Sequence, residues 1–247
     1  MDQTDQLEQT ALIHLVETCG TVDGPGLRYV VFFQGCNLRC KYCHNPDTWI
    51  VNGGESMTLS ELTKDILKYK SYMKFSGGGV TACGGEPLLQ SAFLEQLFKD
   101  LKGHGIHTCL DTSGSVEISR TKDLLSYTDL VLLDVKALNS DKYRQLTNGN
   151  IDIAKAFAKH LDDKRIPVWV RYVVIPGISD GDDDIIDLAQ YLNTLSNIER
   201  VDLLPFHKMG EEKWESLKLP YTLKDTPIPQ AERMTHLNEL LRSNWNG

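Results

Sequence analysis

The sequence predicts an α/β fold: a partial (β/α)6 TIM-like barrel of parallel strands, in a single domain that spans residues 1–247. Short runs rich in Val, Leu, Ile and aromatic residues alternate with amphipathic segments, which favours parallel strands joined by right-handed crossovers. The strand runs are almost continuously apolar, as expected for strands that are buried on both faces. A chain of 247 residues also has the usual length of one α/β barrel domain, and no repeat or Pro/Gly linker divides it.

Strands and helices are expected in alternation along the whole chain. The predicted strands end in Gly, Pro or a polar residue and cover residues 27–35, 78–85, 106–114, 129–136, 167–177 and 201–207. The predicted helices cover residues 59–74, 87–103, 118–126, 141–161, 183–195 and, at the C-terminus, about 230–243. The acidic run at 179–186 is interpreted as a helix N-terminus, and the polar, Pro-containing stretch at 208–230 as a surface loop.

Charge and composition argue against several classes of protein. The net charge of −8 is unfavourable for a broad nucleic-acid surface, which needs an excess of Lys and Arg on one face. The acidic N-terminus lacks the basic start and apolar run of a secretion signal, and no stretch reaches the ~18 apolar residues that span a bilayer. We therefore expect a cytoplasmic protein with protein or small-molecule partners, and no nucleic-acid or membrane partner.

The six cysteines divide into a tight group and three isolated residues. Cys36, Cys40 and Cys43 lie in the loop GCNLRCKYCHNP at residues 35–46. Because cytoplasmic thiols are normally kept reduced, this spacing indicates metal or redox chemistry rather than a disulfide framework. The isolated cysteines stand in apolar surroundings and are expected to be small buried core residues: Cys19, Cys83 and Cys109.

Three kinds of site are compatible with the cysteine loop. Residues 40–44, CKYCH, match the attachment pattern of c-type haem, but that attachment is expected outside the cytoplasm and leaves Cys36 unexplained. Zinc held by the three cysteines and His44 has suitable ligands, but adjacent side chains at 43 and 44 point apart. An iron–sulfur cubane needs one thiolate per iron, so three cysteines leave one iron open for chemistry. We favour the cluster.

Polar residues follow the predicted strands at their C-terminal ends, which is where parallel α/β folds place their sites. Arg171 is the exception, because it lies partway along its strand. Since the strand ends meet on one rim, the sequence predicts a single site there. Besides the cysteine loop, the rim residues are Gly84, Gly85, Glu86, Asp111, Thr112, Asp134, Lys136 and His207.

Two motifs resemble those of the radical S-adenosylmethionine (radical SAM) enzymes. One is C-x-x-x-C-x-x-C with Tyr42 before the third cysteine, and the other is GGEP at residues 84–87, after the next predicted strand. Further stretches resemble the glycyl radical enzyme activases of that family: residues 17–49, 76–90, 105–114, 128–136, 168–177 and 203–210. The resemblance covers nearly the whole chain and implies a radical SAM core domain.

The resemblance also implies cofactors and partners. Cys36, Cys40 and Cys43 would hold a [4Fe-4S] cluster whose open iron binds the amino and carboxylate groups of S-adenosylmethionine. Reductive cleavage of its S–C5′ bond would give methionine and a 5′-deoxyadenosyl radical, which takes a hydrogen from a backbone glycine of a partner. Other activases carry extra cysteine-ligated clusters, and no cysteine lies between Cys43 and Cys83. The implied partner is therefore pyruvate formate-lyase, with flavodoxin or ferredoxin as reductant.

By the same resemblance, most rim residues contact the cofactor. Gly84 and Gly85 would let the backbone approach its methionyl end, and Glu86 would assist recognition of its amino group. Asp23 and Arg171 would face the substrate glycine loop. The alternatives are a tight βα turn for the glycines, ion pairs for Asp134–Lys136 and for Arg171, a strand-end histidine at 207 and turn chemistry for Asp23. The remaining implied cofactor contacts are Tyr42, Cys43, His44, Asp134, Val135, Lys136 and His207.

Asp111 and Thr112 prompt a separate hypothesis. The carboxylates of Asp111 and Asp134 are aimed at one site and repel each other unless a cation or an ammonium group lies between them. The resemblance suggests a monovalent cation near the cofactor's carboxylate, held by Asp111, Thr112 and Asp134. A helix cap with solvation is the alternative.

Two other functions stay open at this point. The first is a radical SAM enzyme that acts on a different glycyl radical enzyme, a small molecule or RNA. The second is a non-enzymatic electron-transfer or zinc-binding module, which would not cleave the cofactor.

Overall fold

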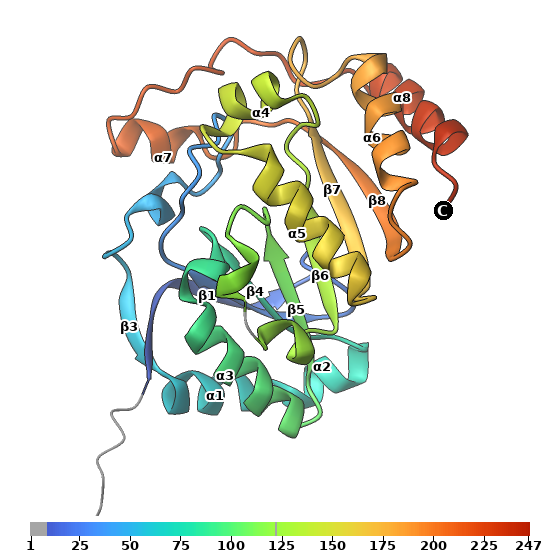
Figure 1. The fold of residues 1–247 in the computed structure, drawn as a ribbon. Coiled ribbons are helices and arrows are strands. Elements are labelled where there is room, and N and C mark those ends of the chain that lie inside the picture. The colour runs from blue at the N-terminus through green and yellow to red at the C-terminus, as the bar shows by residue number, and fades with distance from the viewer. Residues whose placement is uncertain (1–8, 122) are drawn as a thin grey trace, which may run out of the picture.

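The computed structural model describes residues 9–121 and 123–247. Its strands are β1 (Thr10–Gly20), β2 (Arg28–Phe33), β3 (Glu55–Thr58), β4 (Gly79–Gly84), β5 (His107–Thr112), β6 (Leu130–Asp134), β7 (Val168–Val174) and β8 (Ile198–Pro205). They form one sheet in the order β3-β1-β2-β4-β5-β6-β7-β8 (Figure 1). β2, β4, β5, β6, β7 and β8 are parallel, and β1 is antiparallel to both of its neighbours.

The predicted fold class is confirmed. Each predicted strand contains or overlaps one of the parallel strands of the sheet. β8 and β3 lie at opposite ends of the strand order, so the sheet is open rather than closed into a barrel. The loops that follow the parallel strands therefore gather along one edge of the sheet, as the sequence predicts.

Two strands, β1 and β3, are absent from the sequence prediction. The alternation of Ala11 and Ile13, which are 2% and 1% exposed, marks β1 as a strand with one buried face. β3 pairs only with Thr10–Ile13, so the distal half of β1 has β2 as its sole neighbour. The prediction that Cys19 is buried is wrong, because it lies in this distal half and is exposed. The predictions for Cys83 and Cys109 are confirmed, since both are buried.

The helices follow the predicted pattern with two breaks. Residues 59–74 are divided between α1 (Leu59–Leu67) and α2 (Lys70–Ser76), and the helix predicted at 118–126 is replaced by short 3₁₀ turns at Ile118–Arg120 and Leu124–Tyr127. Residues 141–161 are also divided between two helices. The other elements are η1 (Pro46–Trp49), η2 (Pro87–Gln90), α3 (Ser91–Gly103), η3 (Ile118–Arg120), η4 (Leu124–Tyr127), α4 (Ser140–Thr147), α5 (Ile151–Asp163), α6 (Asp182–Leu192), α7 (Glu211–Ser216) and α8 (Ala231–Asn244).

The break between α4 and α5 has a local cause. Asn148 ends α4 in the left-handed conformation, with φ of 58°. The Asn150 side chain then accepts a hydrogen bond from the Asp152 amide and caps α5. A helix that stops leaves its last carbonyls without intrahelical partners, so those of Leu146 and Thr147 are available to another segment.

The interpretation of residues 208–230 as a surface loop is wrong in part. Residues 211–216 form α7, and Trp214 within it is 5% exposed. Because polar residues surround this tryptophan in the sequence, the apolar pattern does not predict the short helix. One large buried side chain, Trp214, anchors that helix. Figure 1 shows α7 at the same end of the molecule as α4.

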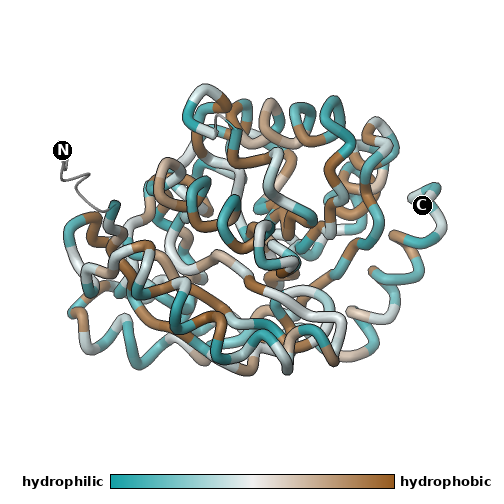
Figure 2. The backbone as a smooth tube through the Cα atoms, turned by 90° about the horizontal axis from the view of Figure 1, so that it is seen from below, coloured by the Kyte–Doolittle hydropathy of each residue, from teal (hydrophilic) through white to brown (hydrophobic). Residues whose placement is uncertain are grey.

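The main core lies between the sheet and the helices that cover it. Hydrophobic segments run through the interior in Figure 2, whereas the outer helices alternate between hydrophilic and hydrophobic residues. This alternation is typical of helices that bury one face against a sheet. Within the described residues, no helix combines the length and the apolar character needed to traverse a lipid bilayer.

Candidate active site at the carboxyl ends of the strands

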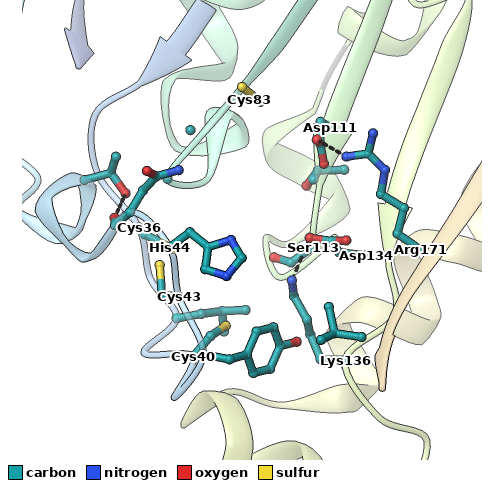
Figure 3. A pocket seen from close by; sticks show the side chains of 18 of the residues that line it. Cys36, Cys40, Cys43, His44, Cys83, Asp111, Ser113, Asp134, Lys136 and Arg171 are labelled. Atoms are coloured by element: carbon teal, nitrogen blue, oxygen red, sulfur yellow. Dashed lines mark hydrogen bonds and ion pairs between the residues drawn. The ribbon is translucent and has the colours of Figure 1, made fainter. Parts of the chain in front are cut away.

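A pocket of about 360 Å³ opens at the carboxyl ends of the parallel strands. Glu86 and Val135 do not line it. Figure 3 shows the three cysteines along one side of the pocket and the charged residues across from them. The predicted site residues that line it are Asp23, Cys36, Cys40, Tyr42, Cys43, His44, Gly84, Gly85, Asp111, Thr112, Asp134, Lys136, Arg171 and His207.

The cysteine loop is hydrogen-bonded to the end of α4. The amide of Arg39 donates to the Thr147 carbonyl at 2.8 Å, and the amide of Lys41 donates to the Leu146 carbonyl at 2.9 Å. These are the carbonyls that the left-handed Asn148 leaves without helical partners. Because residues 39 and 41 flank Cys40, the two bonds fix the main chain on both sides of that cysteine.

Two further contacts hold the ends of the loop. The Asn37 amide group donates to the Ser115 carbonyl at 2.7 Å, and the Ser115 hydroxyl donates back to the Asn37 side chain at 3.0 Å. The indole of Trp214 donates to the Cys43 carbonyl at 2.8 Å, and its ring packs edge-on against Trp49. Three separate segments, α4, the turn after β5 and α7, therefore fix the loop that carries the cysteines.

The three cysteine sulfurs lie near one another but are not arranged to bind a single metal ion. In the part of the chain that the structure describes, no three His, Cys, Asp or Glu side chains converge on one ion position. Burial raises the pKa of Cys36 and Cys40 to about 12 and that of Cys43 to about 11. Without a metal the thiols therefore keep their protons near neutral pH, and metal binding would displace them.

The two glycines of the GGEP motif are required by close packing, Gly84 against the end of β2 and Gly85 against the start of the cysteine loop. A Cβ on Gly85 would lie 2.1 Å from the Gly35 carbonyl oxygen, and one on Gly84 would lie 2.5 Å from the Phe33 nitrogen. Gly84 also has φ of +110°, which other residues rarely adopt. The structure thus supports the interpretation that these glycines are needed for a tight turn between β4 and the following helix. Whether the same glycines also admit the methionyl end of a cofactor stays a prediction.

Glu86 faces the protein interior behind the pocket wall. It is 1% exposed and accepts hydrogen bonds from the Thr112 hydroxyl at 2.6 Å and the Ser113 hydroxyl at 2.7 Å. The amides of Leu88 and Ser113 also donate to it. Burial raises the pKa of this carboxyl, and these hydrogen bonds oppose the rise. Glu86 therefore joins η2 to the turn after β5, and its contact with a cofactor amine stays a prediction.

Two acid–base pairs lie across the pocket from the cysteines. Asp111 forms an ion pair with Arg171 at 2.8 Å, and Asp134 forms one with Lys136 at 2.6 Å. Burial raises the pKa of Asp111 to about 7, Arg171 opposes the rise and Asp134 reinforces it. The two carboxylates are thus balanced by cationic side chains. The structure gives no support to a bound monovalent cation, and the Thr112 hydroxyl already donates to Glu86.

Arg171 connects this network to the turn before β2. Its guanidinium also donates to the Val22 carbonyl, and the Thr81 hydroxyl donates to the Asp23 carbonyl at 2.6 Å. Burial raises the pKa of Asp23, and Arg171 and Arg28 oppose the rise. Asp23 and Arg171 therefore both line the pocket, and Arg171 is engaged by protein partners. That they face a substrate glycine loop stays a prediction.

Two histidines, one of them in the cysteine loop, also line the pocket. The rings of His44 and His207 are stacked with centroids 4.2 Å apart. Burial lowers the pKa of His44, and the neighbouring His207 lowers it further. Among the described residues, the buried Nδ1 of His207 has no hydrogen-bond partner. This pair therefore presents stacked rings at the pocket and contains a buried polar atom that the described residues leave unused.

The comparisons with known proteins agree with this geometry. The sequence pattern of the radical SAM superfamily matches residues 30–189. The chain belongs to this superfamily. A pyruvate formate-lyase-activating enzyme of Staphylococcus epidermidis is 49% identical over 95% of this chain and 96% of its own length. A homologue of the same name from Staphylococcus aureus is 48% identical over 89% of this chain and 90% of its own. The protein is a radical SAM enzyme.

Solved structures of the superfamily share the fold. A domain of a pyruvate-formate lyase-activating enzyme from Bacteroides vulgatus has a TM-score of 0.58 at 24% identity, and the match covers 68% of this chain and 95% of that one. A radical SAM methyltransferase from Sphaerobacter thermophilus has a TM-score of 0.63 at 20% identity, over 98% of this chain and 73% of that one. At this identity the likeness concerns the fold alone.

Several residues that shape the radical SAM site are missing from the sequence prediction. Asn37 and Ser115 hold the loop through side chains whose partners lie 78 residues apart in the chain. Trp214 lies in a stretch interpreted as a loop. A tryptophan three residues after Glu211, in a charged run, was the available signal for α7.

The first prediction concerns Trp214. A Trp214→Phe substitution removes the donor to the Cys43 carbonyl and keeps most of the ring contact, so the free energy of unfolding should fall by about 1 kcal/mol. The control is Trp169→Phe, whose indole donates at 3.4 Å to exposed Glu199 and should change stability by less than about 0.5 kcal/mol. Urea denaturation measures both, and equal losses would contradict the role of Trp214.

The second prediction concerns the pH dependence that Asp111 causes. Its pKa is raised from 3.8 to about 7, so the folded chain keeps a proton that the unfolded chain has lost. The stabilising contribution is complete below the unfolded pKa and disappears as the pH rises through about 7. Asp111→Asn carries no titrating group, so the stability of the parent should fall relative to this variant across that range. A urea series at increasing pH measures the difference, and a constant difference would contradict the shift.

Proposed function

We propose that this protein activates pyruvate formate-lyase by generating a glycyl radical on that enzyme. The observation that carries the proposal is the identity of 48–49% to activating enzymes of this name, over most of both chains. The three cysteines of the motif line the pocket at the rim of the sheet, which supports a reaction centre there.

The residues present fit a [4Fe-4S] cluster and S-adenosylmethionine. Cys36, Cys40 and Cys43 would supply the three thiolate ligands of the cluster, and S-adenosylmethionine would bind beside it. When bound and reduced, the cluster would supply the single electron that cleaves S-adenosylmethionine to methionine and 5′-deoxyadenosine, with the hydrogen atom coming from the partner's glycine Cα, which becomes the glycyl radical.

The pocket residues have distinct roles in this proposal. The stacked His44 and His207 contact the nucleoside, and the unpartnered Nδ1 of His207 is a hydrogen-bonding atom for it. Asp134 and Lys136 are oriented by their ion pair toward the ribose and the carboxylate of the cofactor. Tyr42, over whose ring Lys136 lies at 5.5 Å, forms the adjoining wall.

The same proposal assigns the remaining predicted contacts. The main chain at Gly84, Gly85 and Val135 borders the methionyl end, and Glu86 acts from behind by fixing the turn after β5. Asp23 and Arg171, which also line the pocket, receive the glycine loop of the partner.

The electron comes from a partner outside this chain. We propose a flavodoxin or a ferredoxin as the reductant, because a single low-potential electron is needed for each cleavage. A cytoplasmic location, where such donors and pyruvate formate-lyase occur together, belongs to the same proposal.

The third prediction tests the proposed function with matched cysteine variants. Anaerobic reconstitution of the parent and of Cys19→Ser should give about four irons per chain, whereas Cys43→Ser should lose the competent cluster. With S-adenosylmethionine and a strong reductant, the first two should release 5′-deoxyadenosine. Added pyruvate formate-lyase should then show a glycyl radical by electron paramagnetic resonance. Cofactor cleavage without that radical would indicate another radical SAM reaction, and a colourless zinc protein would exclude both.

A further inference from the structure

Tyr143 of α4 has a buried hydroxyl that the described residues leave without a hydrogen-bond partner. The side chain is 1% exposed. An unsatisfied buried hydroxyl destabilises a folded protein, so its retention calls for a partner that the polypeptide itself does not supply.

The hydroxyl lies on the cluster side of the fold. Tyr143 belongs to a small apolar group with Tyr42 and Phe206, and Cys40 packs against that group. Cys40, one of the three proposed cluster ligands, therefore packs against the group that contains the tyrosine.

Tyr143 and the cysteine loop form one packed unit. The carbonyls of Leu146 and Thr147, one turn further along α4, accept the amides on either side of Cys40. A Cβ on Gly149 would lie 2.5 Å from a Leu38 methyl and 3.2 Å from the Tyr143 ring, so the loop, the ring and the end of α4 are in close contact. The hydroxyl cannot turn away without disturbing these contacts.

The hydroxyl is able to act as a donor. A tyrosine has an ordinary pKa of about 10 and keeps its proton at neutral pH. A neutral phenol donates one hydrogen bond, and thiolate or sulfide sulfur in a cluster accepts such bonds.

A buried water is the competing partner. A cavity of about 20 Å³ borders Tyr143 and shares Ser113, Asp134 and Lys136 with the large pocket. This is enough space for one water molecule. Much of the lining is apolar, including Leu133, Ala154 and Ala158, and two of its charged side chains, Asp134 and Lys136, are already paired with each other.

We infer that the Tyr143 hydroxyl donates a hydrogen bond to a sulfide of the iron–sulfur cluster and thereby raises the cluster's reduction potential. This inference rests on the proposed function, because it requires a cluster on Cys36, Cys40 and Cys43. A donor to sulfur stabilises the reduced, more negative cluster, so the hydroxyl makes the one-electron reduction easier.

The fourth prediction compares Tyr143→Phe with Tyr29→Phe. Tyr29 is equally buried, but its hydroxyl already donates to Asp65, on the far side of the sheet from the loop. Without iron, Tyr143→Phe should unfold at the same urea concentration as the parent or at a higher one, whereas Tyr29→Phe should unfold at a lower one. With the cluster, the midpoint potential of Tyr143→Phe should shift to a more negative value, and Tyr29→Phe should match the parent.

Each outcome decides a different claim. Equal potentials for the parent and Tyr143→Phe, both with a full complement of iron, would overturn the inference and favour a buried water. A parent chain that takes up no cluster would overturn the proposed function, and the inference with it. If Tyr143→Phe folds but loses iron, 3-fluorotyrosine at position 143 supplies a stronger donor, and its potential should then lie above that of the parent. An unchanged value would overturn the inference.

Discussion

Two main-chain hydrogen bonds, from Arg39 and Lys41 to the last carbonyls of α4, fix the direction of the central cysteine of the loop. They exist because Asn148 adopts a left-handed conformation and stops the helix one turn before α5 begins. Trp214 and Asn37 then fix the two ends of the loop. A loop of three thiols without such anchors would lose conformational entropy when it binds a cluster. Here the loop has already lost that entropy when the chain folds, so cluster binding does not have to order it.

The acidic and basic side chains of the pocket balance each other's charge in the absence of a ligand. Asp111 and Asp134 face the same space and each has its own cationic partner, so neither an unpaired carboxylate nor a bound metal cation is required. The pocket is therefore lined by paired charges at one side and by the three cysteines at the other (Figure 3).

The sequence was sufficient for the parallel part of the fold and for the rim of the site. Continuous apolar runs identify strands that are buried on both faces, and chain order places their ends together. The sequence was insufficient where tertiary contacts decide the direction of a side chain or the presence of a short helix. Glu86 follows a strand but turns inward, because Thr112 and Ser113 offer it donors. The polar surroundings of Trp214 hide α7, whereas the Asn-Gly-Asn run at 148–150 was a readable signal for the break after α4.

The central claim is that the polypeptide positions the cysteine loop before a cluster binds. Hydrogen exchange of individual amides in the iron-free protein tests it most directly. The amides of Arg39 and Lys41 should exchange slowly, with protection close to that of amides in neighbouring β2, because their acceptors belong to α4. Exchange at the rate of an unprotected loop, with protection appearing only after iron and sulfide are added, would contradict the account.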